Sequence, residues 1–128
     1  MNTKELRTFA RSSIFGSLQE RADGGLFDRG LWRAMADTGI VGMALERRFG
    51  GGGAGMNEFV ECASLLAGEG LDLGLVLSLV DHVALCAYPL QVFGSGWLKE
   101  RYLTSLCSGE YIGAAAVSEE EGEAARTA

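Results

Sequence analysis

Residues 71–88 read Leu-Asp-Leu-Gly-Leu-Val-Leu-Ser-Leu-Val-Asp-His-Val-Ala-Leu-Cys-Ala-Tyr, and this stretch decides the fold. Wound as a helix, it places apolar side chains on almost every side, and such a helix is buried in a protein core or in a lipid bilayer. Asp72, Asp81 and His82 disfavour the bilayer, because a charge near the middle of a membrane helix costs about 3 kcal/mol. We therefore expect a buried central helix that Pro89 interrupts at its end, and no membrane span.

Four more helices are predicted around it, from apolar residues at helical spacing and from capping residues. Asn2 or Thr3, Asp28 and Ser95 stand where N-caps are expected, and Phe27 and Trp32 have the spacing of a hydrophobic staple. The four helices span residues 3–22, 28–38, 56–67 and 95–108. The sequence thus predicts an all-α bundle of about five helices.

Two short apolar runs, residues 40–45 and 111–117, could be extended. The second would be the first strand of a β-domain that this chain lacks, because a lone strand has no partner for its amides. We therefore expect a helical domain over residues 1–110. Residues 111–128 would begin the missing β-domain and end in an acidic tail.

Composition indicates a globular protein of one domain or part of a larger one, with 48% apolar and 22% charged residues in a chain of 128. The net charge is −6 and no basic stripe occurs, which disfavours a nucleic-acid partner. Cys62, Cys86 and Cys107 form no C-x-x-C pair, so neither a disulfide framework nor a zinc site is indicated. The polar N-terminal region has no signal-peptide core, and we expect a cytoplasmic protein.

A glycine-rich run, residues 50–55, formally satisfies the dinucleotide-binding pattern G-x-G-x-x-G at Gly50, Gly52 and Gly55. Residues 40–45 would then form the preceding strand. Four residues, 46–49, separate that run from the first glycine, where the pattern requires an immediate turn. The dinucleotide interpretation therefore stays open as a minor alternative.

Asp81 and His82 are the next candidates for chemistry, and His82 is the single histidine of the chain. Adjacent helical residues point about 100° apart, so the two cannot act as a directly bonded acid–base pair. We expect a hydrogen-bonded polar pair in the core, with a substrate-facing role for one of them as the alternative. Residues 118–121, Ser-Glu-Glu-Glu, are expected to be solvated.

Several short segments then occur in a familiar order, and together they resemble the N-terminal helical domain of the acyl-CoA dehydrogenase family over about residues 27–119. Each segment is unspecific alone, but their order and spacing are specific. The matching segments are residues 31–36, 38–42, 49–51, 58–67, 89–90, 93–94, 99–103, 108–113 and 116–119, together with Ser78 and His82.

The resemblance implies a component of a flavoenzyme that binds FAD and oxidises the Cα–Cβ bond of an acyl thioester. In that family a glutamate of the C-terminal helical bundle takes the α-proton while the β-hydride goes to the flavin. The chain would carry no catalytic residue and no metal site, would be inactive alone, and would need a partner that carries the β-domain and the bundle, or a second copy. The alternative is a non-catalytic helical interaction protein derived from this fold.

The resemblance also implies site residues. Val117 and Ser118 match the segment that touches the flavin ring, although Glu120 replaces the family's proline and Ala124 its thioester-contacting serine. Leu77, Ser78 and Asp81 match the helix that lines the acyl end of the substrate pocket. A polar Asp81 there would suit a short or polar acyl group.

Overall fold

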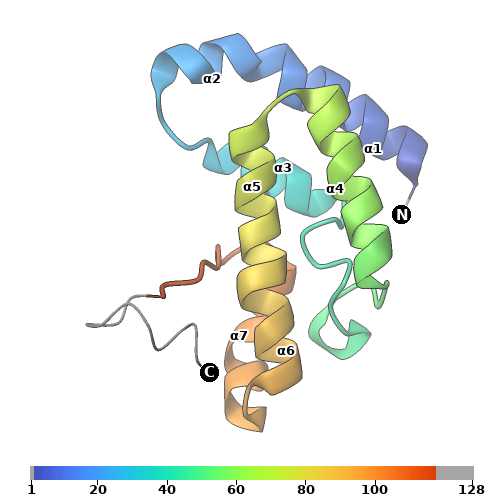
Figure 1. The fold of residues 1–128 in the computed structure, drawn as a ribbon, viewed down its shortest axis with the longest axis vertical. Helices are drawn as coiled ribbons and strands as arrows, with labels where there is room; N and C mark the ends of the chain where they lie inside the picture. Colours follow the sequence, from blue (N-terminus) through green and yellow to red (C-terminus); the bar gives the residue numbers. More distant parts are fainter. Residues whose placement is uncertain (1, 118–128) are drawn as a thin grey trace.

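The structure, a computed structural model, describes residues 2–117, and the regular elements in that range are all helical. They form five rods (Figure 1), so the predicted all-α bundle is confirmed. The acidic residues after position 117 lie outside the described part of the chain. The rods are built from α1 (Thr3–Phe9), η1 (Ala10–Ile14), η2 (Phe15–Ser17) and α2 (Leu18–Gly24); α3 (Arg29–Asp37); α4 (Met56–Gly70); α5 (Leu73–Val80), η4 (Asp81–Ala87) and α6 (Tyr88–Phe93); and α7 (Gly96–Cys107).

The helices begin where the capping residues predict. The Asn2 side chain accepts a hydrogen bond from the Lys4 amide at 3.1 Å, and Asp28 accepts one from the Leu31 amide at 2.9 Å. Ser95 accepts a longer one from Leu98 at 3.4 Å. These bonds satisfy amides of the first turn that have no partner inside the helix.

The rods pack around one main core. In Figure 1 the first rod lies across the upper end of the molecule, and α4 runs beside α5 with α3 behind them. The core draws residues from all of these rods, among them Ile14, Trp32, Phe59 and Leu79. The rod made of α5, η4 and α6 is called the long rod below, and a smaller apolar cluster joins α7 to its lower part.

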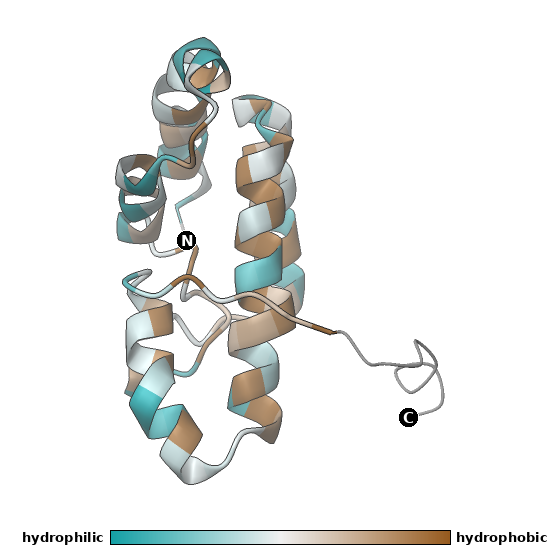
Figure 2. Cartoon of the chain, turned by 90° about the vertical axis from the view of Figure 1, so that its left-hand side faces the viewer, coloured by the Kyte–Doolittle hydropathy of each residue, from teal (hydrophilic) through white to brown (hydrophobic). Residues whose placement is uncertain are grey.

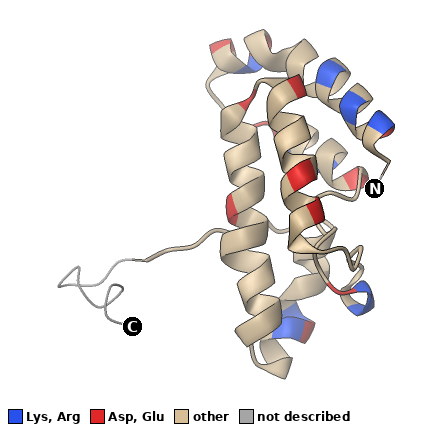
Figure 3. Cartoon of the chain, turned by 45° about the vertical axis from the view of Figure 1, so that its right-hand side comes forward, with Lys and Arg blue, Asp and Glu red and all other residues tan. Residues whose placement is uncertain are grey.

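Ion pairs support the contact between the first rod and α4. Arg7 and Arg11 both reach Glu69, at 3.0 and 2.5 Å. Figure 3 shows basic residues along α1 and acidic residues along α4, while the long rod is almost free of charge. The two arginines are more than half exposed, so solvent screens each pair and its contribution to stability is small.

The long rod differs from its prediction in two ways. Its inner face is buried, including Leu75 and Leu79, but Leu73, Leu77 and Leu85 are 69%, 60% and 54% exposed. The prediction that this helix is buried on every side was therefore wrong, because the neighbouring rods cover only one of its faces. The stretch Leu73–Phe93 has the length and composition of a membrane span, and a third of its most apolar window is buried within the protein.

Pro89 does not interrupt the rod, which continues to Phe93. The turn before it is π-helical, and the Tyr88 amide donates to the carbonyl of Val83, five residues back. Pro89 then falls in the first turn of α6, where a missing N–H costs least.

The two apolar runs are not strands. Residues 40–45 form tight, fully buried turns, and no strand occurs among residues 2–117. Residues 111–117 form an irregular segment that crosses the long rod and leaves the helical body (Figure 2). The prediction of an extended conformation was therefore wrong for residues 40–45. Residues 111–117 join no sheet within the described range.

The glycine-rich loop packs against backbone and does not form a phosphate cradle. The amides of Gly52 and Gly53 donate to the carbonyls of Gly42 and Leu45, at 3.0 and 2.8 Å. A Cβ on Gly51 would overlap the Leu45 carbonyl. With these amides occupied and no strand before the loop, the dinucleotide interpretation is wrong.

Candidate functional site

The three predicted substrate residues share the outward face of α5 and its continuation. Leu77 and Asp81 are exposed and one turn apart, and Ser78 lies beside them, half-buried. The Ser78 hydroxyl donates to the carbonyl of Gly74 at 2.9 Å. The structure thus brings the three together on an open surface.

Apolar side chains extend this surface along the rod. Leu73, Leu77, Leu85 and Val92 are each about half exposed or more, and Val60 on α4 is 55% exposed. We call the four residues of the rod, without Val60, the outer apolar face. Figure 2 shows that hydrophobic residues recur along the whole rod. A contiguous exposed apolar surface is typical of an interaction site.

A shallow apolar groove borders this face between α4 and α5. Its floor is carbon-rich, with few polar atoms to bond a ligand. It is lined by Met56, Phe59, Val60, Ala63, Ser64, Ala67, Val76, Val80 and Ala84. Such a surface suits an alkyl chain or an apolar helix.

Asp81 is a carboxylate within the outer apolar face, one turn from Leu77 and from Leu85. None of the ion pairs formed within residues 2–117 includes it. The prediction that Asp81 and His82 form a polar pair in the core is therefore wrong for Asp81, because adjacent helical residues point in different directions.

His82 is fully buried and satisfies both ring nitrogens. The Gly113 amide donates to Nδ1 at 2.9 Å, so Nε2 carries the proton and donates to the Leu106 carbonyl at 3.1 Å. The Trp32 ring meets the imidazole edge-on, with centroids 5.2 Å apart. Burial lowers the pKa of His82, against the opposing effect of the Leu106 carbonyl. The expected hydrogen-bonded core residue is thus found at His82.

Val117 ends the described segment and is 74% exposed. Ser118, the other predicted flavin contact, lies outside the described residues. The backbone of Ala115, Ala116 and Val117 makes no hydrogen bond to another residue of the described range. The side chains of residues 113–116 are small, so a flat ring could approach this backbone closely.

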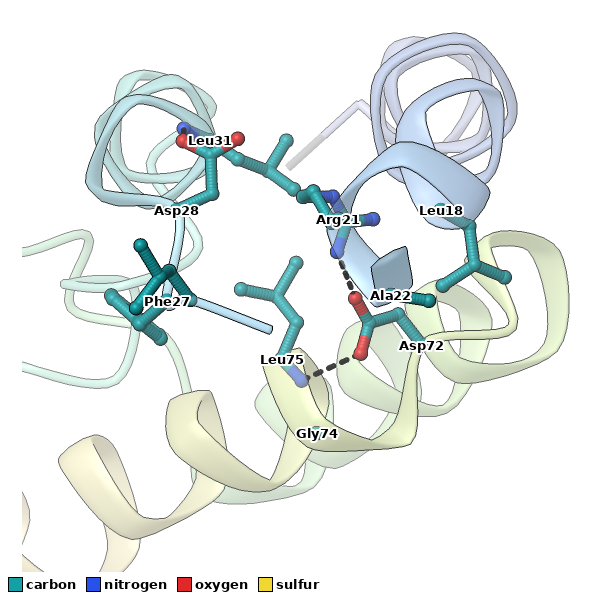
Figure 4. A pocket seen from close by; sticks show the side chains of 10 residues that line it. Leu18, Arg21, Ala22, Phe27, Asp28, Leu31, Asp72, Gly74 and Leu75 are labelled. Carbon is teal, nitrogen blue, oxygen red and sulfur yellow. Dashed lines mark hydrogen bonds and ion pairs between the residues drawn. The ribbon is translucent and has the colours of Figure 1, made fainter. Parts of the chain in front are cut away.

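A second hollow, between α2, α3 and the start of α5, contains a partly buried ion pair (Figure 4). Arg21 pairs with Asp72, and each side chain is 14% exposed. The guanidinium also donates to the Ile14 carbonyl at 2.6 Å and to the Ser17 hydroxyl at 3.0 Å. The polar groups of this pair are therefore already bonded to other groups of the domain.

Asp72 also caps α5, accepting from the Leu75 amide at 2.9 Å. Burial alone would raise the pKa of Asp72, but the Leu75 amide and the Arg21 guanidinium together lower it. This cap was not among the helix starts predicted from the sequence. Its signal was an aspartate three residues before Leu75 at the start of an apolar helix.

Comparison with known proteins identifies the fold. Residues 1–110 match the family model described as acyl-CoA dehydrogenase, N-terminal domain. The L-prolyl-[peptidyl-carrier protein] dehydrogenase of Serratia sp. is 32% identical over 111 residues, which are 87% of this chain and 29% of that protein. The short-chain specific acyl-CoA dehydrogenase of Megasphaera elsdenii is 31% identical, with the same 87% and 29% coverage.

Solved structures agree with these sequence matches. The FAD complex of PigA superimposes with a TM-score of 0.85 at 30% identity, over 93% of this chain and 31% of that one. The butyryl-CoA dehydrogenase of Megasphaera elsdenii gives a TM-score of 0.77 at 27% identity, over 92% and 32%. The chain spans less than a third of each of these relatives. It belongs to the acyl-CoA dehydrogenase family and corresponds to the N-terminal helical domain.

Proposed function

We propose that this chain is the N-terminal helical component of an FAD-dependent flavoenzyme that oxidises the Cα–Cβ bond of an acyl thioester. The observation that carries the proposal is the outer apolar face of the long rod, with Asp81 within it, on a chain that belongs to this family. Both sequence and structural relatives include enzymes that act on acyl thioesters, one on a carrier protein and one on short-chain acyl-CoA.

The chain's own part is to enclose the acyl group. Leu77 and Ser78 would contact it, and the apolar side chains around them would keep water from the reacting carbons. Asp81 would meet a polar or cationic end of the acyl group, which fits a relative whose substrate is a prolyl thioester. No residue of the chain takes the α-proton.

The 115–117 backbone would hold the flavin, because its amides and carbonyls make no hydrogen bond within the described range and the side chains of Ala115 and Ala116 are small. Val117 is the described residue of this proposed contact, and Ser118 would add a hydroxyl. FAD, when bound, supplies the acceptor for the β-hydride.

The partner we propose is the remainder of such an enzyme, a β-domain and a C-terminal helical bundle, on the same polypeptide or on another. It would cover the outer apolar face and bring the catalytic glutamate. We also propose a cytoplasmic location, because the apolar rod has one face in the protein core and carries Asp81 and His82.

A non-catalytic interaction protein is the second candidate function. Glu120 and Ala124 stand where the family has its proline and its thioester-contacting serine, and these changes favour loss of flavin binding.

One experiment separates the two candidates. The chain is co-expressed with the polypeptide that supplies the β-domain and bundle, and the purified complex is examined for the flavin absorbance band and for reduction by short acyl thioesters. Flavin and bleaching by substrate support the enzyme. A colourless complex supports the interaction protein, and turnover by the chain alone would contradict the proposed division of labour.

The variant Leu77→Arg tests the role of the outer apolar face more directly, because it places a charge on that face. Val60→Arg is the control, since it is a similarly exposed apolar residue on α4. We expect Leu77→Arg to abolish substrate bleaching in the complex and Val60→Arg to retain it. Equal effects would mean that the face near Leu77 does not border the acyl group.

A further inference from the structure

We propose that His82 and Trp32 are positioning residues that fix the direction in which the chain leaves the helical domain, and so present the backbone near Val117 to the flavin. The claim that this backbone is presented to the flavin rests on the proposed function. The claim that the two residues fix the direction of the exit segment concerns the chain alone and is tested separately.

His82 joins the last turn of α7 to the exit segment through its two ring nitrogens. Through Nε2 it holds the last turn of α7, at Leu106, and through Nδ1 it holds Gly113, seven residues later. The imidazole is fully buried, so water does not compete for either bond. One side chain therefore holds the backbone at two points between the end of α7 and the exit.

Trp32 fixes the bend between those two points. Its indole Nε1 donates to the Gly109 carbonyl at 3.0 Å. Gly109 has a φ of 72°, and a Cβ there would lie 2.7 Å from Ala36 Cβ. A glycine is thus required at the bend, and the indole holds it against α3.

Gly113 lies flat against the long rod for a steric reason as well. A Cβ at this position would overlap the Cys86 thiol. Beyond Gly113 the side chains of residues 114–117 are exposed. The direction of these residues is consequently set at Gly109 and Gly113.

Protonation of His82 would break this arrangement at one point. The Gly113 amide needs a lone pair on Nδ1, and imidazolium has none. The groups around the ring are Trp32 from α3, the Leu106 carbonyl from α7, Gly113 from the exit segment and Cys86 on its own helix. None of them is charged near neutral pH, since burial raises the pKa of the Cys86 thiol. The nearby carboxylates, Asp81 and Glu110, are exposed.

Two variants separate positioning from simple stabilisation. His82→Asn keeps an acceptor where Nδ1 stands and does not titrate. His82→Gln keeps a donor toward Leu106 but withdraws the acceptor from Gly113. Circular dichroism of the full chain checks that both variants retain the helical fold.

The first readout is hydrogen exchange at the Gly113 amide of the full chain. Wild type should protect this amide at about pH 7.5, relative to the intrinsic rate, because the neutral imidazole accepts its hydrogen bond. His82→Asn should keep this protection, and His82→Gln should show about tenfold less. Equal protection in the two variants would overturn the proposal. Loss of protection in acid is expected only below the ordinary titration range of histidine, because burial lowers the pKa of His82.

The second readout is the dissociation constant of FAD from the assembled enzyme. We expect His82→Gln to raise it about tenfold and His82→Asn to leave it within about threefold of wild type. Exchange as expected with unchanged FAD affinity would overturn the positioning role and leave the flavoenzyme assignment intact. A wild-type assembly that binds no flavin would instead contradict the proposed function. Hydrogen exchange at Gly113 does not depend on flavin, so it would not be affected by that failure.

Discussion

Gly51→Ala should destabilise the helical domain strongly, whereas Gly68→Ala should stabilise it slightly. A Cβ on Gly51 would overlap the carbonyl of Leu45 and lie 2.9 Å from the carbonyl oxygen of Gly42. These are backbone atoms, so the loop itself must shift. Overpacking of this kind costs about 1–3 kcal/mol, and distorting the adjacent loop hydrogen bonds adds roughly 1 kcal/mol. We expect a total loss of about 3 kcal/mol.

Gly68 is the matched control, because it is exposed on α4 and a methyl group added there would have no atom within 4 Å. Alanine there should add about 0.5–1 kcal/mol through helix propensity. Urea denaturation followed by circular dichroism measures both changes, and the shared Gly-to-Ala exchange makes the unfolded-state contributions comparable. Stability of Gly51→Ala equal to that of the parent would refute the loop packing described above.

Four further outcomes are expected from the capping, ion-pair and thiol environments. Asp28→Ala should lower the unfolding free energy by about 1 kcal/mol in the same urea assay, because α3 loses its N-cap. Arg21→Met should cost about 3 kcal/mol, since Asp72 is left partly buried without its partner. Because the pKa of Asp72 is lowered in the fold, its contribution is present above about pH 4 and is lost as the pH falls further, so acid titration of the unfolding free energy should show a smaller decline in Arg21→Met. Burial raises the pKa of Cys107 to about 11, so a thiol reagent at about pH 8 should label it slowly in the native chain and quickly in urea.

Local signals in the sequence predicted the helices well. Asp28 and Ser95 cap their helices as expected, and Gly25, with a φ of 65°, ends the first rod. Capping and helix termination depend on residues within one turn, and the sequence displays those directly. The shared face of Leu77, Ser78 and Asp81 follows from helical geometry in the same way.

Contacts between distant residues could not be predicted. Arg21 and Asp72 are 51 positions apart, and His82 and Gly113 are 31 apart. Nothing in the spacing of either pair indicates that the residues meet, because the fold decides which rods are neighbours. The buried turns at residues 40–45 were missed for a related reason. An apolar run of six residues suits a strand and a buried turn equally well, and here the backbone hydrogen bonds go to the glycine loop.

The apolar pattern of the long rod has two causes, whereas the prediction from the sequence attributed all of it to burial. Leu75, Leu79 and Val83 are apolar because they fill the core of this domain. Leu77 and Leu85 are apolar on the opposite side, where the described chain leaves each of them more than half exposed. Full burial of a leucine contributes about 1.5–3 kcal/mol, so the outer residues together offer several kcal/mol to whatever packs on them. Association consumes part of that energy. The outer apolar face is therefore best explained by a contact outside the domain, and the contact proposed above, with an acyl group and the rest of a flavoenzyme, would also account for Asp81.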